Sequence, residues 1–217
     1  MTLTAQCFPN LLVGRRRFLL GFGFLPLVAA APKPPVITVL GDSITAGLGL
    51  PARDAMPAQL QAALGRLGVP AVVRAAGVSG DTSGGGLARV GFSVAGDTRL
   101  CVVALGGNDL LQGVEPSQTK ANLRGVLQKL KARGIGAVLV GVGAPPTIGA
   151  SYAREFNALY PSLAREFAVP LYANILAGVN GAPALMQRDG IHPNAAGARR
   201  IGEALAPIVA KALKGRT

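Results

Sequence analysis

The chain has 217 residues, with 22 Lys or Arg against 10 Asp or Glu, so its net charge is +12 at pH 7. Half of the residues are apolar, which is enough for the core of one α/β domain. The basic residues are scattered and no basic run contains interleaved aromatic residues, so the composition argues against a nucleic-acid partner.

The first 30 residues have the layout of an export signal. Three arginines at positions 15–17 precede the apolar stretch FLLGFGFLPLVAA, and the order Arg-Arg-x-Phe-Leu favours a twin-arginine signal over an ordinary secretory one. An uncleaved membrane anchor is the alternative, but the stretch is shorter than the ~20 residues of a spanning helix and Pro26 interrupts it. We therefore expect cleavage after Ala30, and a periplasmic or secreted domain of residues 31–217 with charge +9 and no stable membrane insertion.

Short apolar runs then alternate with helical patterns. Runs rich in Val, Ile and Leu predict five strands near residues 36–41, 70–75, 100–105, 135–141 and 170–172, of the kind that is covered on both faces. Helical patterns lie at residues 115–134, 151–167 and 193–213. This alternation predicts a parallel sheet between two layers of helices, with the active crevice at the carboxyl ends of the strands.

The loop after the first strand, LGDSITAGLGLP, contains Ser43. A serine that leads from a strand into a helix can present its hydroxyl to the crevice while its N–H points at a developing oxyanion. An ordinary turn is an equally good reading of three residues. A phosphate-binding loop is a weaker one, because no Lys follows in the P-loop pattern and the glycines lack the dinucleotide spacing.

Two further strand-end loops carry groups that could donate hydrogen bonds to the same point. Gly80 lies in AAGVSGDTSGGG after the second strand, and Asn108 lies in LGGNDLL after the third. Taken singly, each loop could be a simple turn.

Cys101 is the one cysteine outside the export signal, so the exported chain has no disulfide and no metal-ligand spacing, and we expect a small core residue there.

The fourth loop, MQRDGIHPNAAG, holds His192, the single histidine of the chain. Asp189 precedes it by three residues, and a turn at Gly190 could bring the carboxylate to one ring nitrogen while the other accepts the proton of Ser43. Pro193 directly after the histidine could begin a helix and hold the imidazole in place.

Together these loops resemble the SGNH, or GDSL, hydrolase superfamily. Ser43, Gly80, Asn108 and His192 match its four named positions, and Asp189 matches the acid of its D-x-x-H block. The stretches GDTSGGGLARV, LGGNDLLQGVEPSQT, YPSLAREFAVPL and MQRDGIHPN are similar to its branch of bacterial periplasmic thioesterases, lysophospholipases and arylesterases, and the likeness runs over almost the whole exported chain.

The resemblance implies a three-layer α/β/α, flavodoxin-like fold with a five-stranded parallel sheet, and hydrolysis of acyl esters and thioesters through an acyl-serine, without metal or cofactor. It implies Ser43 as nucleophile, His192 as general base and then acid, and Asp189 as the group that orients His192. The N–H groups of Ser43 and Gly80 and the side chain of Asn108 would form the oxyanion hole.

Substrate choice is less determined by these motifs. The segments LLQGVEP and GAPPTIGASY resemble the rim of an acyl pocket, so we expect Leu110, Leu111 and Ile148 to contact a small-molecule acyl substrate of a monomeric enzyme. Asp42 and Asp109, next to the motif residues, are expected to make structural hydrogen bonds. A carbohydrate O-acetyl esterase on the same fold and a non-catalytic lipid carrier are the alternative functions.

Overall fold

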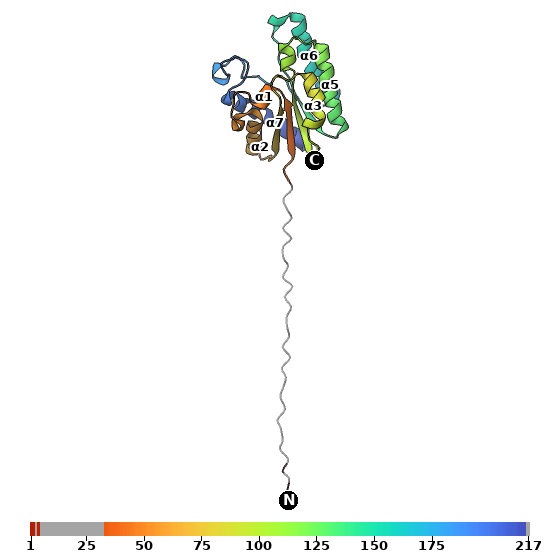
Figure 1. Ribbon diagram of the computed structural model, residues 1–217, viewed down its shortest axis with the longest axis vertical. Coiled ribbons are helices and arrows are strands. Elements are labelled where there is room, and N and C mark those ends of the chain that lie inside the picture. The colour runs from red at the N-terminus through yellow and green to blue at the C-terminus, as the bar shows by residue number, and fades with distance from the viewer. Residues whose placement is uncertain (3, 5–32, 216–217) are drawn as a thin grey trace. The chain divides into compact units, whose positions relative to one another are not determined.

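Five parallel strands form the centre of the fold, in the order β2-β1-β3-β4-β5 across the sheet. The computed structural model describes residues 1–2, 4 and 33–215, and residues 33–215 form one compact unit (Figure 1). The strands are β1 (Val36–Gly41), β2 (Val72–Gly77), β3 (Thr98–Ala104), β4 (Gly136–Val140) and β5 (Leu171–Tyr172). This strand order is that of flavodoxin-like sheets, so the predicted fold class is confirmed.

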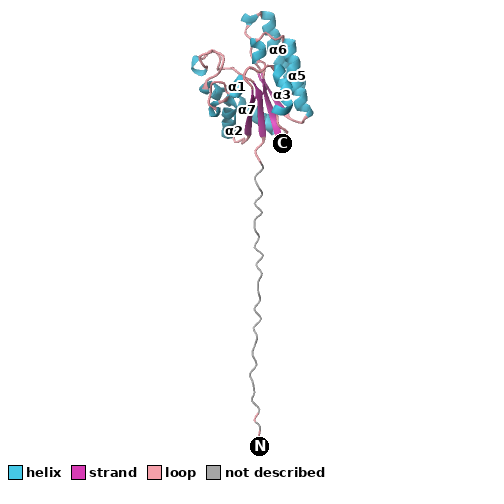
Figure 2. Cartoon of the chain, in the orientation of Figure 1, coloured by secondary structure: helices cyan, strands magenta, loops and turns pink. Residues whose placement is uncertain are grey.

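Helices cover both faces of the sheet (Figure 2). They are α1 (Ser43–Ala46), α2 (Met56–Arg66), α3 (Ser83–Ser93), α4 (Gly107–Leu111), α5 (Pro116–Ala132), α6 (Ala150–Phe167) and α7 (Ala195–Lys214), with 3-10 turns η1 (Ala52–Asp54), η2 (Pro146–Ile148) and η3 (Pro183–Leu185). Apolar residues of α2 and α7 form one core against the sheet, and those of α3, α5 and α6 form the other. The three helices predicted from periodicity are therefore confirmed as α5, α6 and α7.

The central strands place successive side chains in opposite cores. In β1, Ile37 and Val39 pack towards α2 and α7, whereas Leu40 packs towards α3, α5 and α6. Cys101 of β3 is likewise completely buried in the second core. A strand covered on both faces needs mostly apolar residues, which explains the near-continuous apolar runs of the sequence.

The second strand differs from its prediction. It begins at Val72, two residues later than expected, and its side chains are exposed or half-buried because β2 is an edge strand. Its first backbone N–H, that of Val72, donates to the carbonyl of Pro35, whereas Pro70 has no N–H to donate. The strand also ends two residues later than predicted, at Gly77, which lies three residues before Gly80.

The strand order determines where a site can form. The chain leaves β1 towards one edge of the sheet and later returns to the other side of β1, so the connections diverge between β1 and β3. In such sheets ligands bind at the carboxyl ends of the strands beside this divergence. Within the described residues, no helix has both the length and the apolar character that crossing a membrane requires.

Candidate active site

Ser43 is the first residue of α1 and follows the end of β1 by two positions. The Asp42 carboxylate caps this short helix by accepting a hydrogen bond from the N–H of Ile44 at 3.1 Å. A side chain at Gly41 would not fit, because its Cβ would overlap the hydroxyl of Thr45. The Gly-Asp-Ser order thus supplies close packing, a helix cap and a hydroxyl at the carboxyl edge of the sheet.

His192 connects Ser43 to Asp189. Its Nε2 lies 2.9 Å from Oγ of Ser43, and its Nδ1 lies 2.6 Å from Oδ2 of Asp189. Ser43 is 8% exposed, and the side chains of His192 and Asp189 are 16% and 43% exposed, so the chain of hydrogen bonds leads from the protein interior to solvent. The structure therefore brings together the three side chains that the sequence predicted as a triad, from segments 149 positions apart.

The backbone around Asp189 sets the protonation state of the triad. Gly190 has a φ of +67°, and this turn lets Oδ1 of Asp189 accept from the N–H groups of His192 at 3.0 Å and Ile191 at 2.9 Å. Together with the side-chain bond to His192, these bonds lower the pKa of Asp189 to about 2. An ionised carboxylate only accepts hydrogen bonds, so Nδ1 of His192 carries a proton and Nε2 is free to accept one from Ser43.

Contacts that the sequence did not indicate hold the histidine loop in place. The N–H of Gln187 donates to the carbonyl of His192 at 2.8 Å, and its Nε2 donates to the carbonyl of Leu48 at 2.7 Å. Pro193 does not begin the following helix as expected, since Asn194 caps it and α7 starts at Ala195. Asn directly before a helical pattern is a cap signal, whereas the bond from Gln187 to Leu48 spans 139 positions and leaves no local signal.

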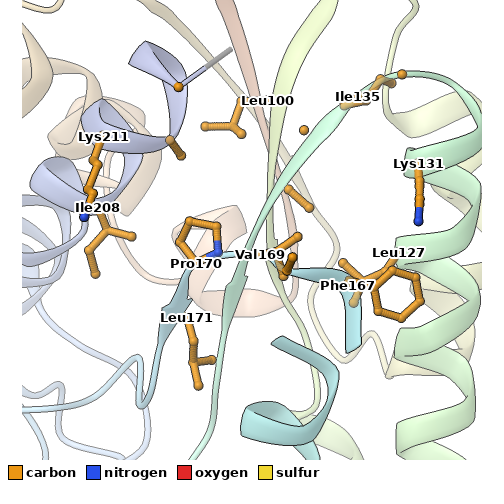
Figure 3. A pocket seen from close by; sticks show the side chains of 16 residues that line it. Leu100, Leu127, Lys131, Ile135, Phe167, Val169, Pro170, Leu171, Ile208 and Lys211 are labelled. Atoms are coloured by element: carbon orange, nitrogen blue, oxygen red, sulfur yellow. The ribbon is translucent and has the colours of Figure 1, made fainter. Parts of the chain in front are cut away.

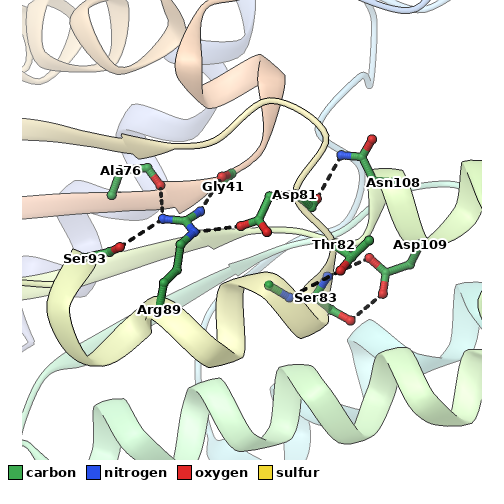
Figure 4. Close-up of polar contacts among 10 residues, drawn as sticks. Gly41, Ala76, Asp81, Thr82, Ser83, Arg89, Ser93, Asn108 and Asp109 are labelled. Carbon is green, nitrogen blue, oxygen red and sulfur yellow. Dashed lines mark hydrogen bonds and ion pairs between the residues drawn. The ribbon is translucent and has the colours of Figure 1, made fainter.

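The predicted oxyanion donors line the same cavity as His192. Ser43, Gly80 and Asn108 are all in its wall, together with His192. Nδ2 of Asn108 donates one hydrogen to the carbonyl of Asp81 at 2.9 Å (Figure 4). An amide nitrogen has two hydrogens, so this bond orients the side chain and leaves the second hydrogen for a ligand.

A second buried polar cluster fixes the segment that carries Asn108. The neighbouring Asp109 is completely buried, and it accepts from the N–H of Ser83 at 2.7 Å and from the Ser83 hydroxyl (Figure 4). It also accepts from the Thr119 hydroxyl at 3.2 Å. These partners belong to α3 and α5, so Asp109 joins α4 to two longer helices. The expectation that Asp42 and Asp109 make structural hydrogen bonds is confirmed.

The cavity at Ser43 has a volume of about 280 Å³ and a mostly apolar wall. Its apolar lining residues are Ile44, Leu48, Ala104, Leu110, Leu111, Val140, Val142, Ile175, Leu176 and Ile191. Of the predicted substrate contacts, Leu110 and Leu111 belong to this lining. Ile148 lies elsewhere, half-exposed in η2 and outside the lining, so the structure narrows the acyl-pocket prediction to the two leucines.

A larger hollow of about 700 Å³ lies at the opposite ends of the strands from Ser43, where β4 and β5 begin (Figure 3). Its lining is apolar apart from Lys131 and Lys211, and contains no acid, histidine, cysteine or hydroxyl side chain. Apart from these two lysines, its lining therefore offers no group for nucleophilic or acid–base chemistry. The smaller cavity at Ser43 is the candidate active site.

The described part of the chain has neither a reactive cysteine nor a group of side chains that could bind a metal ion. Burial raises the pKa of the Cys101 thiol to about 12, which keeps it protonated and unreactive, as expected for a core residue. Among residues 1–2, 4 and 33–215, no three His, Cys, Asp or Glu side chains gather in a group that could hold a metal ion.

Comparison with known proteins gives consistent matches over most of the chain. The GDSL-like Lipase/Acylhydrolase family model matches residues 39–200. Esterase TesA of Pseudomonas aeruginosa is 39% identical over 196 residues, which cover 89% of this chain and 98% of that protein. Thioesterase 1/protease 1/lysophospholipase L1 of Escherichia coli is 40% identical over 180 residues, 82% of this chain and 85% of that protein. The crystal structure of AlinE4, an SGNH-hydrolase family esterase, is 41% identical and superimposes with a TM-score of 0.71, covering 85% of this chain and 99% of that one.

The buried carboxyl of Asp42 makes folding stability depend on pH. Burial raises the pKa of Asp42 from 3.8 to about 6, so the folded protein binds this proton more tightly than the unfolded chain. The resulting stabilisation is complete below the unfolded pKa and is lost as pH rises through the folded one. We expect the free energy of unfolding of wild type, relative to Asp42→Asn, to fall by roughly 2 kcal/mol between pH 4.5 and 7.5. Urea unfolding of both proteins at the two pH values measures this, and an identical pH dependence would contradict it.

Proposed function

The chain belongs to the GDSL-like lipase/acylhydrolase family and is a hydrolase of acyl esters and thioesters, and we propose that Ser43, His192 and Asp189 carry out this reaction through an acyl-serine intermediate. The observation that carries the proposal is the continuous path of hydrogen bonds from Oγ of Ser43 through His192 to Asp189, at 2.9 and 2.6 Å. This is the arrangement in which an imidazole can take the proton of an attacking serine.

The acylation step uses both ring nitrogens of His192. Oγ of Ser43 attacks the acyl carbonyl carbon while its proton moves to Nε2, and the resulting imidazolium is stabilised by the ionised Asp189. The tetrahedral intermediate then collapses, the bond to the leaving oxygen or sulfur breaks, and Nε2 returns the proton to that atom. The acyl group remains on Ser43.

Deacylation repeats the sequence with water. Nε2 of His192 accepts a proton from a water molecule that attacks the acyl-serine carbonyl, and the proton then returns to Oγ of Ser43 as the carboxylic acid leaves. In both steps the negative oxygen of the tetrahedral intermediate accepts hydrogen bonds from the N–H groups of Ser43 and Gly80 and from the free hydrogen of Asn108 Nδ2. Their common position in the cavity wall and the orientation of the Asn108 amide support this role.

The apolar wall of the cavity favours fatty acyl esters over acetylated carbohydrates. In water, the hydroxyls of a sugar are hydrogen-bonded to the solvent. A carbohydrate site needs polar groups that take over these hydrogen bonds, since buried polar groups without partners cost binding energy. The cavity instead presents leucine, isoleucine and valine from α4, from the end of β4 and from the loop after β5. We infer that the acyl chain of the substrate lies along this wall. Aryl esters, thioesters and lysophospholipids can all carry such a chain.

The nucleophile assignment is tested by Ser43→Ala. We expect the variant to fold and to lose almost all turnover of a nitrophenyl ester, because among the described residues only the Ser43 hydroxyl is hydrogen-bonded to Nε2 of His192. A fluorophosphonate should label wild type at Ser43 and leave the variant unlabelled. A Ser43→Ala protein with normal turnover would refute the assignment, whereas wild type that binds lipids but neither turns over esters nor reacts with the fluorophosphonate would favour the lipid carrier.

The acyl pocket is tested with nitrophenyl esters of increasing chain length. Burial of one methylene contributes about 0.8 kcal/mol, so kcat/KM should rise up to about fourfold per added carbon until the cavity is filled. Leu110→Ala should reduce this gain and leave the acetate ester unchanged. The matched control is Ile148→Ala, which removes an aliphatic side chain outside the lining and should keep the wild-type series. A flat or falling series in wild type would instead favour the O-acetyl esterase.

The proposed export signal is residues 1–30, of which residue 3 and residues 5–30 lie outside the described residues. We propose that it directs the domain of residues 31–217 to the periplasm or the medium through the twin-arginine route, on the sequence features alone. N-terminal sequencing of the exported protein should then begin at Ala31. A variant with Arg15→Lys and Arg16→Lys should accumulate as uncleaved precursor, and normal export of this variant would contradict the route.

A further inference from the structure

Arg89 of α3 is a nearly buried arginine whose three guanidinium nitrogens all donate to groups behind the active-site loops (Figure 4). Its Nε donates to Oδ2 of Asp81 at 2.7 Å, and its Nη2 donates to the carbonyl of Gly41 at 2.8 Å. Its Nη1 donates to the carbonyl of Ala76 at 2.8 Å and to the Ser93 hydroxyl at 3.2 Å. One side chain therefore binds the end of β1, the end of β2 and the loop that follows β2.

These acceptors are adjacent to all three proposed oxyanion donors. Gly41 is two residues before Ser43, and Asp81 directly follows Gly80. The carbonyl of Asp81 accepts the hydrogen bond that orients Asn108. A displacement of Asp81 would therefore move the Gly80 N–H through the shared peptide and the Asn108 amide through its hydrogen bond.

We propose that Arg89 is a positioning residue that holds the oxyanion donors of Ser43, Gly80 and Asn108 in one arrangement by clamping Gly41 and Asp81. The inference rests on the oxyanion roles proposed above. Arg89 does not line the cavity, so it acts only through these neighbours.

The chemistry of the clamp requires an arginine. The side chains of Arg89 and Asp81 are 11% and 10% exposed, so each charge depends on the other for compensation. The planar guanidinium directs donors to four acceptors at fixed angles, whereas a lysine offers three donors from a single flexible point. Lysine could keep the ion pair with Asp81, but it could not also reach the ends of two strands.

Another arginine bound to the same helix provides a matched control. Arg133 donates to the carbonyls of Val90 and Val94 at the end of α3, at 3.2 and 2.5 Å, and so also anchors this helix. Neither of these two carbonyls adjoins a residue of the candidate site. Removing Arg133 should therefore test the general cost of loosening α3, and removing Arg89 should test the clamp.

Steady-state kinetics of Arg89→Met, Arg89→Lys, Asp81→Asn and Arg133→Met on one nitrophenyl ester test the proposal. We expect Arg89→Met to lower kcat by about 10- to 100-fold with KM within about twofold, because loss of one oxyanion donor costs roughly 10²- to 10³-fold and the acyl wall is untouched. Arg89→Lys and Asp81→Asn should also lower kcat. Arg133→Met should keep its kcat within about twofold, even if its thermal midpoint falls as far as that of Arg89→Met.

A double-mutant cycle with Asn108→Ala separates positioning from general destabilisation. If Arg89 acts through the Asn108 amide, removing Arg89 from an Asn108→Ala enzyme should lower kcat at least threefold less than removing it from wild type. If Arg89→Met does not fold, the same cycle with Arg89→Lys decides.

Two results would overturn the inference: a folded Arg89→Met enzyme with wild-type kcat, or fully multiplicative effects of the two substitutions. Ser43→Ala, measured alongside, keeps the two proposals apart. Normal turnover of Ser43→Ala would refute the proposed function itself, whereas an inactive Ser43→Ala beside an unaffected Arg89→Met would refute only the role of Arg89.

Discussion

The hydrogen bond between Nε2 of His192 and Oγ of Ser43 depends on the packing of two helices that are distant in the sequence. Soon after Ser43 the chain enters α2, and soon after His192 it enters α7. The two helices lie so close that a Cβ at Gly202 of α7 would approach the backbone N of Leu60 in α2 to 2.7 Å. This close contact fixes the relative position of the loops that carry Ser43 and His192. The hydrogen bond from Gln187 to Leu48 joins the two loops directly at the site.

The polar interactions of the site are divided between two sides of the cavity. On one side, backbone N–H groups hold Asp189 ionised, which determines the tautomer of His192. On the other, buried charges and hydroxyls of α3, α4 and α5 hold the loop that carries Gly80 and the short helix α4, which carries Asn108. Buried polar groups are costly unless they are satisfied, so these clusters restrict the loops to few arrangements. Rigid donors of this kind can stabilise a developing negative charge without first reorganising.

Most of the remaining cavity wall is apolar, and this contrast suits acyl transfer. The reacting carbonyl meets polar donors at the end of the sheet, while the acyl chain meets leucine, isoleucine and valine. The larger hollow at the opposite ends of the strands has no such contrast, since its lining offers only two lysines among apolar residues. Cavity size alone would therefore point to the wrong place, and the chemistry of the lining identifies the candidate site.

The sequence by itself determined the five strands, three of the long helices and a parallel sheet between two layers of helices, because buried strands need near-continuous apolar runs. Its strand-end motifs, through their resemblance to a known family, predicted the flavodoxin-like class and the residues of the candidate triad. Only the tertiary structure decided the later start of β2, the position of Ile148 outside the cavity and the contacts of Arg89, Asp81 and Gln187. The physical reason is distance along the chain. Local periodicity and capping act over a few residues, whereas a guanidinium that binds the ends of two strands has partners 13 and 48 positions away.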